Sequence, residues 1–131
     1  MDFDREIPFV RHLGFELVRF DGGEAEIAWS PRPEHLNYLG VTHGGSLMTV
    51  LDTALAHAAR SVDPSLGVVT IEMKTTFMHP ADGPLRATGR LLHRTRQMAF
   101  VEGRVTDARG QVCAHATGTF RYLMPPPPAS A

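Results

Sequence analysis

Hydrophobic and polar residues alternate with a period of two along much of the chain, which is the pattern of strands that bury one face. Residues 15–20 and 24–29 are two such runs, and Asp21-Gly22-Gly23 between them is a hairpin signal. The pattern therefore predicts two antiparallel strands, preceded by a short helical turn at residues 8–13.

The period changes to that of a helix over residues 44–60. Asp63-Pro64 ends this pattern, because the residue before a proline avoids helical backbone angles. We therefore expect one long helix, with its apolar side formed by Leu47, Leu51, Ala54, Leu55 and Ala58.

Four further strands are predicted after the helix. In the first of them, strict alternation places Thr70 and Glu72 on one face and Ile71 and Met73 on the other. The four runs are residues 69–77, 85–91, 98–106 and 112–122, with a turn at 107–110.

This order of elements predicts an α+β fold, in which an antiparallel sheet of about five to six strands wraps around one long central helix. A single helix covers one face of such a sheet and leaves its edges open, so we expect the chain to dimerise. The 131 residues suffice for a single domain, predicted at residues 1–124. The consecutive prolines that begin at Pro125 predict a disordered proline-rich tail over 125–131.

Composition narrows the possible partners. The formal net charge is −1, so the chain lacks the overall basic field that would hold nucleic acid or an anionic membrane. No apolar run is long enough for a membrane span, and the acidic start of the sequence is unlike a signal peptide. The single cysteine, Cys113, excludes an intrachain disulfide. We expect a cytoplasmic protein with no nucleic-acid or membrane partner.

His43-Gly44-Gly45 leads directly into the predicted helix. The first amides of a helix have no acceptor inside it, and glycines let a ligand approach them closely. Such an amide could stabilise the oxyanion that forms when a carbonyl is attacked. A glycine pair before a helix is, however, more often a plain helix start.

Asp52 lies on the flank of the predicted helix, in line with Gly45, Thr49 and Ala56 and beside the apolar stripe. It is a candidate catalytic carboxylate, and a solvated surface aspartate is the alternative. Gly45 and Asp52 are seven residues apart, which is about 10 Å along the axis, too far for both to serve one reacting carbonyl. Two helices of a symmetric dimer could each supply one of the two groups, so we expect a site shared between subunits.

The residues from Asn37 to Asp52 match the pattern N-x-x-G-x-x-H-G-G-x6-D completely. In this string the sequence resembles the hotdog-fold thioesterases, specifically the phenylacetate-pathway (PaaI-like) subgroup of the 4-hydroxybenzoyl-CoA thioesterase-like superfamily. The resemblance covers roughly residues 10–123 and includes the strand Thr70 to Phe77.

The resemblance implies the hotdog fold, an acyl-CoA substrate, a homodimer or homotetramer, and hydrolysis without a cofactor. It implies that Asp52 is the catalytic nucleophile or general base and that the amide of Gly44 or Gly45 is the oxyanion donor. By the same resemblance, Asn37 positions substrate or water, His43 orders the start of the helix and Thr70 holds a water molecule.

Other residues offer rival sites. The seven histidines show no metal-ligand spacing, so no metal is expected; His12, His35, His79, His93 and His115 are predicted at the surface or at edges. Cys113 is expected to be an ordinary half-buried thiol. Glu72 competes with Asp52, because strict alternation gives it the same strand face as Thr70. Three arginines could bind the phosphates of CoA, although a solvated hairpin end explains them equally well: Arg90, Arg94 and Arg96.

Two function classes remain open besides the thioesterase. One is a non-catalytic acyl-CoA-binding hotdog protein, a use that some relatives make of the fold in sensing; the lack of a DNA-binding segment counts against a transcriptional sensor. The other is a hotdog dehydratase or hydratase, whose usual His/Asp or His/Glu pair the arrangement of His43 and Asp52 does not resemble.

Overall fold

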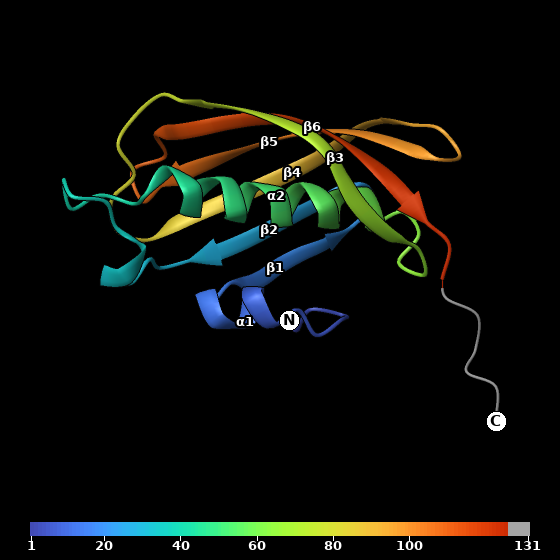
Figure 1. The fold of residues 1–131 in the computed structure, drawn as a ribbon, viewed down its shortest axis with the longest axis horizontal. Helices are drawn as coiled ribbons and strands as arrows, with labels where there is room; N and C mark the ends of the chain where they lie inside the picture. Colours follow the sequence, from blue (N-terminus) through green and yellow to red (C-terminus); the bar gives the residue numbers. More distant parts are fainter. Residues whose placement is uncertain (126–131) are drawn as a thin grey trace.

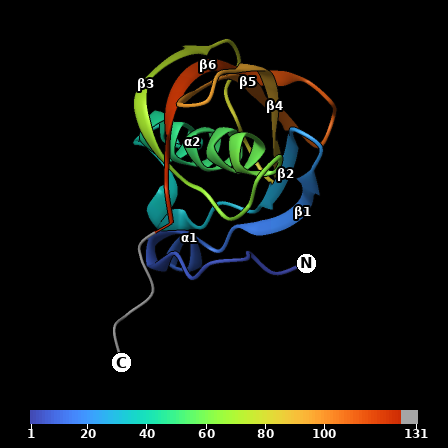
Figure 2. The same cartoon turned by 90° about the vertical axis from the view of Figure 1, so that its right-hand side faces the viewer.

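One antiparallel sheet curls around a single long helix, α2 (Gly44–Arg60), in the computed structural model, which describes residues 1–125 (Figures 1 and 2). The strand order is β1-β2-β4-β5-β6-β3, so the predicted α+β class and strand count are confirmed. The prediction for the tail falls almost wholly on residues 126–131, outside the described residues. The other elements are α1 (Pro8–Leu13), β1 (Glu16–Asp21), β2 (Glu24–Trp29), a 3-10 turn (Pro33–His35), β3 (Gly67–Phe77), β4 (Leu85–Arg94), β5 (Met98–Asp107) and β6 (Val112–Leu123).

The apolar side of α2 faces the concave side of the sheet. Every residue of the predicted stripe is at most 4% exposed, and Val50 joins it at 1%. The removal of this stripe from water is the main force that holds helix and sheet together. The opposite flank, with Thr49 and Asp52, remains only half-buried, so the helix presents its polar row at the open side of the sheet.

Paired glycines bring the sheet unusually close to the helix. Gly89 of β4 lies opposite Gly103 of β5. A Cβ on Gly89 would lie 2.6 Å from the carbonyl oxygen of Ala54, and one on Gly103 would lie 2.5 Å from Leu55 Cδ1. Side chains at these positions would push the helix outward, so the glycines fix how deeply α2 sits in the sheet.

A β-bulge in β3 reverses which residues face the helix. Thr70 pairs with Phe120 of β6, but the next pair is Glu72 with Thr119, so Ile71 is the extra residue. Phe120 belongs to the buried core, which places Thr70 on the inner face. The Thr119 hydroxyl donates to Glu72 Oε1 at 2.9 Å on the outer face. The strict alternation that grouped Thr70 with Glu72 is therefore wrong, because one extra residue shifts the pleat by half a period.

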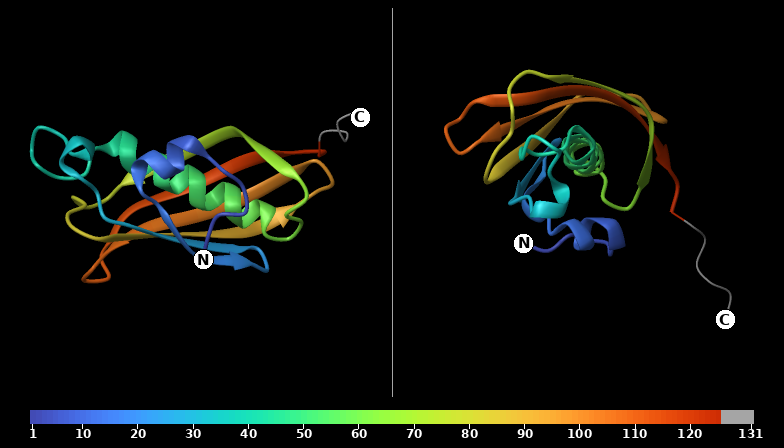
Figure 3. Two further views of the ribbon diagram at one scale, coloured as in Figure 1. Left: turned by 90° about the horizontal axis from the view of Figure 1, so that it is seen from below. Right: turned by 60° about the vertical axis from the view of Figure 1, so that its left-hand side comes forward.

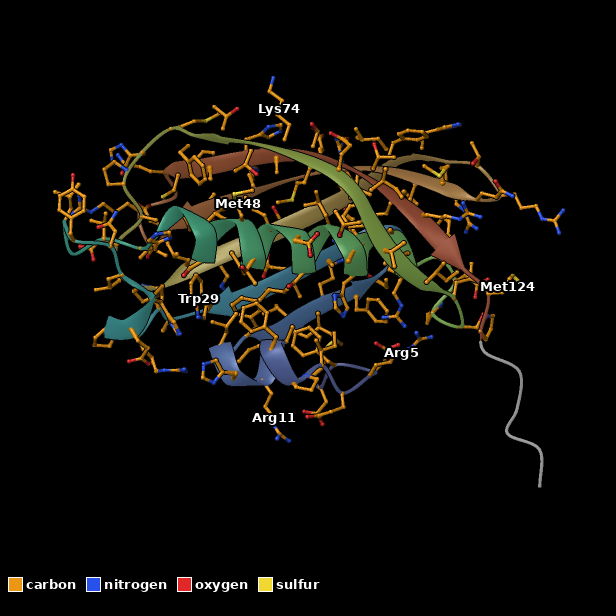
Figure 4. The ribbon with its side chains drawn as sticks, in the orientation of Figure 1. Arg5, Arg11, Trp29, Met48, Lys74 and Met124 are labelled. Atoms are coloured by element: carbon orange, nitrogen blue, oxygen red, sulfur yellow. The ribbon has the colours of Figure 1, made fainter. Side chains whose placement is uncertain are left out.

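Residues 1–13 close the open side of the sheet below α2 (Figure 3). The indole of Trp29 lies between β2 and α1, and its Nε1–H donates to the carbonyl of Leu13 at 3.0 Å (Figure 4). The Arg60 guanidinium donates to both carboxylate oxygens of Asp4, at 3.1 and 2.6 Å. Arg5 adds bonds to the carbonyls of Pro64 and Ser65. The N-terminal segment is thus held at the C-terminal end of α2.

We expect this attachment to depend on pH. The Arg60 guanidinium hydrogen-bonded to Asp4 holds the pKa of that carboxyl below its usual range. A depressed pKa gives stability that is full above the unfolded-state pKa and is lost as pH falls through the folded-state value. Asp4→Asn should therefore lower the free energy of unfolding by about 1 kcal/mol near neutral pH, and by progressively less as pH falls below the usual aspartate pKa of ~3.9. Urea unfolding across this range measures the difference, with exposed Asp2→Asn as the matched control. An Asp4→Asn deficit that stays constant down to low pH would contradict the role of the ion pair.

The two edges of the sheet are β1 and β3. The β3 edge carries large exposed apolar side chains in this single chain, a combination that an isolated monomer ordinarily avoids. They are Val69, Ile71, Phe77 and, just beyond the strand, Met78, each between 43% and 56% exposed.

Candidate active site

Asp52 meets Thr70 at the open side of the sheet. The Thr70 hydroxyl donates to Asp52 Oδ1 at 2.6 Å, joining the middle of α2 to the inner face of β3. The bulge at Ile71 separates Thr70 on the inner face from Glu72 on the outer face, so Thr70 is the residue that reaches Asp52. Asp52 is half-buried, and Oδ2 has no hydrogen-bond partner within residues 1–125. The carboxylate is thus oriented through one oxygen and free to act through the other.

His43 caps the start of α2. Its Nδ1 accepts a hydrogen bond from the amide of Gly45 at 2.8 Å, and its carbonyl accepts from Ser46 and Leu47. This cap agrees with the predicted ordering role of His43. It also means that the Gly45 amide is already engaged, whereas the Gly44 amide has no acceptor in the part of the chain that the structure describes. Of the two predicted oxyanion donors, Gly44 is the one that could bind a ligand.

Asn37 shapes the loop before the helix. Its Oδ1 accepts from the amides of Leu39 and Val41, at 2.9 and 3.3 Å, which closes a tight turn around Gly40. Gly40 has a φ of 79°, a left-handed conformation that favours glycine. The Asn37 side-chain NH₂ group takes no part in this turn, so it could still donate to a ligand.

Gly44 and Asp52 are too far apart to act together within one chain. They are eight residues apart on one straight helix, about 12 Å along its axis. A donor and a base that serve one carbonyl must both lie about 3 Å from the reacting atoms. The geometry of the single chain therefore contains two half-sites, one at each position.

A cavity of about 410 Å³ opens beside Asp52. It lies between the N-terminal segment and α2, and Met73 of β3 completes its wall. Ile7 and Phe9 contribute to this wall, which the sequence did not predict. Their apolar character was visible before the first strand, but nothing in the sequence indicated that this segment folds back against α2.

The rival residues do not gather around Asp52. Glu72 is on the outer face, bonded to Thr119. Cys113 is fully buried, not half-buried as predicted, and burial raises the pKa of its thiol, which disfavours the reactive thiolate. His57 is buried and its Nδ1 lies 2.7 Å from the carbonyl of Thr53, so it forms no dyad with Asp52.

His35 was wrongly predicted at the surface. It is only 6% exposed, packs against the Trp29 ring with centroids 5.5 Å apart, and accepts a bond from the Arg32 amide through Nδ1. Its carbonyl also accepts from the His43 amide at 2.9 Å. His35 therefore holds the loop that positions the start of α2, a role that depends on tertiary contacts.

The three predicted phosphate-binding arginines do not form one cluster. Arg90 is paired with Glu102 on the outer face of the sheet. The Arg94 guanidinium lies over the Tyr122 ring, 4.5 Å from its centroid. Arg96 lines a separate hollow together with Arg121. Arg96 is the one of the three whose guanidinium has no ion pair or ring contact within residues 1–125.

Residues 1–125 contain no group of three or more His, Cys, Asp or Glu side chains arranged to hold a metal ion. No helix among them is long and apolar enough to cross a membrane.

The model of a known protein family matches the part of the chain that contains the site. The model of the thioesterase superfamily matches residues 39–114, which is more than half of the 131-residue chain. The matched range contains Gly44, Asp52 and Thr70.

Individual proteins agree in sequence and in fold. The Escherichia coli K12 protein named acyl-coenzyme A thioesterase PaaI is 27% identical over 104 residues, covering 78% of this chain and 73% of that protein. A conserved protein of Pseudomonas aeruginosa has a structure with a TM-score of 0.86 and 28% identity, covering 90% of this chain and 95% of that one. A Streptococcus mutans UA159 protein solved bound to acetyl-CoA has a TM-score of 0.79 and 26% identity, covering 86% and 90%.

Proposed function

Because the chain belongs to the thioesterase superfamily, and is therefore a hotdog-fold thioester hydrolase, we propose that it hydrolyses acyl-CoA thioesters to the free acid and CoA. The observation that carries this proposal is the half-buried Asp52, held by the Thr70 hydroxyl at the mouth of an apolar cavity. The similarity to a protein solved with acetyl-CoA supports the choice of the CoA thioester.

In the proposed reaction Asp52 acts as general base. A water molecule donates to the free Oδ2 and to the Thr70 oxygen, whose own proton is given to Oδ1. Asp52 takes a proton from this water as its oxygen attacks the thioester carbonyl. The tetrahedral intermediate then expels the CoA thiolate, which receives the proton from the Asp52 carboxyl. Atoms and charge balance without a metal or a cofactor.

The Gly44 amide is the proposed oxyanion donor. Its N–H lies at the start of α2, where the helix dipole favours negative charge. An amide fixed in this way stabilises the oxyanion without having to reorganise during the reaction.

The proposed working unit is a dimer in which Asp52 of one chain and Gly44 of the other serve the same thioester. The separation of these groups in one chain supports this arrangement, and so does the exposed apolar edge of β3. Sedimentation that shows a fully active monomer would overturn it.

A panel assay for release of free CoA tests the function. We expect the purified protein to cleave acyl-CoA in the presence of EDTA, with turnover that depends on Asp52. If calorimetry detects binding of acyl-CoA but no member of a short, medium, long and aryl panel is cleaved, the protein is an acyl-CoA-binding protein instead.

A single turnover in H₂¹⁸O tests the role of Asp52 as a base. With enzyme in excess, we expect ¹⁸O in the product acid from the first turnover, because the attacking oxygen comes from water. A nucleophilic Asp52 would form an anhydride, and attack of water on the Asp52 carbonyl of that anhydride would leave an unlabelled oxygen of Asp52 in the first product. Mass spectrometry of the acid detects this route, and unlabelled first product would exclude the general-base mechanism.

A further inference from the structure

The cavity beside Asp52 has walls from three parts of the chain. The N-terminal segment contributes Ile7 and Phe9, α2 contributes Met48, and β3 contributes Met73. Phe9 and Met48 are at its rim and remain 57% and 38% exposed in the single chain. Its volume of about 410 Å³ is in the range of pockets that enclose small organic groups.

The side chains that line the cavity favour the acyl part of a thioester over the CoA part. No arginine or lysine lines the cavity within residues 1–125, and Asp52 is its only carboxylate. Burial lowers the pKa of His57, which favours the neutral ring. The phosphates of CoA would lie there without a cation and close to a carboxylate, whereas an apolar acyl chain would lose water-exposed surface.

The connectivity of the substrate gives the same assignment. The attacked carbonyl carbon must be within about 3 Å of the group that Asp52 activates. The acyl chain is bonded directly to this carbon, so it must leave the reaction centre through the space next to Asp52. This cavity is an apolar space that Asp52 itself lines.

Ala56 and His57 of α2 line the cavity beyond Asp52, and His57 packs against two half-buried aromatic rings. Ala56 is one helical turn beyond Asp52, about 6 Å along the axis, and also lines the cavity. His57 follows it and contacts the rings of Phe3 and Phe20 edge-on, with centroids 5.0 and 5.7 Å away. A chain that grows past Ala56 therefore meets packed rings.

The wall formed by residues 3–10 is fixed to the body of the protein. The Asp4–Arg60 ion pair joins it to the last turn of α2, and the Arg60 side chain is only 6% exposed. Val10 at the other end of the segment belongs to the buried core. Such a wall can exclude long acyl chains because it cannot move aside without breaking these contacts.

We propose that the acyl group of the substrate occupies this cavity and that Phe9 and Ala56 restrict it to uncharged, apolar acyl groups of short to medium length. The inference rests on the proposed hydrolysis of acyl-CoA and names its substrate class.

The test measures kcat/KM for acetyl-, butyryl-, hexanoyl-, octanoyl- and palmitoyl-CoA, and for the charged glutaryl-CoA. Wild type should be fastest between butyryl and octanoyl. Ala56→Phe fills the inner end, so the octanoyl-to-acetyl ratio should fall at least about tenfold. Phe9→Ala opens the rim, so the palmitoyl-to-butyryl ratio should rise at least about threefold. Phe100→Ala removes another exposed ring, on β5 and outside the cavity lining, and should leave both ratios unchanged.

Binding of thioether analogues gives a second readout that needs no catalysis. Here a CH₂ replaces the thioester carbonyl, and calorimetry should show the same dependence on chain length and the same shifts in the variants. If wild type cleaves none of the thioesters, the proposed function fails. The binding series still tests whether the acyl group occupies the cavity. Unchanged length preference in both folded variants, or glutaryl-CoA used as well as hexanoyl-CoA, would overturn the assignment. Thermal unfolding verifies that each variant is folded. If Ala56→Phe does not fold, the length preference of Phe9→Ala alone tests the proposal.

Discussion

Asp52→Asn should reduce kcat for acyl-CoA hydrolysis by at least a hundredfold, about 3 kcal/mol in activation free energy, with little change in substrate affinity or stability. The asparagine keeps the size of the side chain and can still accept the hydrogen bond from Thr70. It cannot take a proton from water, so the loss should fall on the chemical step. Stopped-flow release of CoA and calorimetry with a thioether analogue measure the two effects separately.

Two variants serve as controls for this loss. Glu72→Gln makes the same chemical change on the outer face, where Glu72 contacts Thr119, and should remain near wild type. Thr70→Ala should lose about tenfold, because the hydroxyl orients the carboxylate and the water but forms no bond to the substrate. An inactive Glu72→Gln beside an active Asp52→Asn would transfer the catalytic role to Glu72.

Gly44→Pro should lower kcat by about a hundredfold, because it removes the N–H proposed to stabilise the oxyanion. Proline is well accepted at the first position of a helix. The preceding residue, His43, already has the extended backbone that precedes proline, with φ −62° and ψ 137°. The substitution therefore deletes one donor and leaves the helix in place.

Gly44→Ala is the matched control. It introduces a Cβ at the same place, 3.3 Å from the Phe77 ring, and keeps the N–H. Any steric effect near Phe77 is thus common to both variants, and the difference in kcat between them reports the donor. Equal kcat values for the two folded variants would argue that the Gly44 amide does not stabilise the transition state.

The fold was predictable because its strongest signals are local. The helical stripe around Leu51 and Leu55 and the alternation in the strands follow from which side chains face the core. The bulge at Ile71 was not predictable. Its sequence is indistinguishable from regular alternation, and only the pairing of Thr70 and Glu72 with β6 reveals the extra residue.

The site was predictable where it follows the helix and not where it depends on segments that meet in space. The place of Asp52 on the flank of α2 and the His43 cap both follow from helical geometry. The engagement of the Gly45 amide by His43, the burial of His35 and the cavity wall at Phe9 depend on how loops fold back. Periodicity carries no information about such contacts.

Mixed dimers test the central claim, that Asp52 of one chain and the Gly44 amide of the other act on one thioester. Asp52→Asn and Gly44→Pro chains, each inactive alone, are combined by co-expression with two affinity tags so that only mixed dimers are purified. One of the two sites then carries both lesions and the other carries neither. The shared site predicts recovery of up to about half the wild-type kcat in the mixed dimer. Mixed dimers as inactive as their parents would contradict it, since every site would then depend on both groups from the same chain.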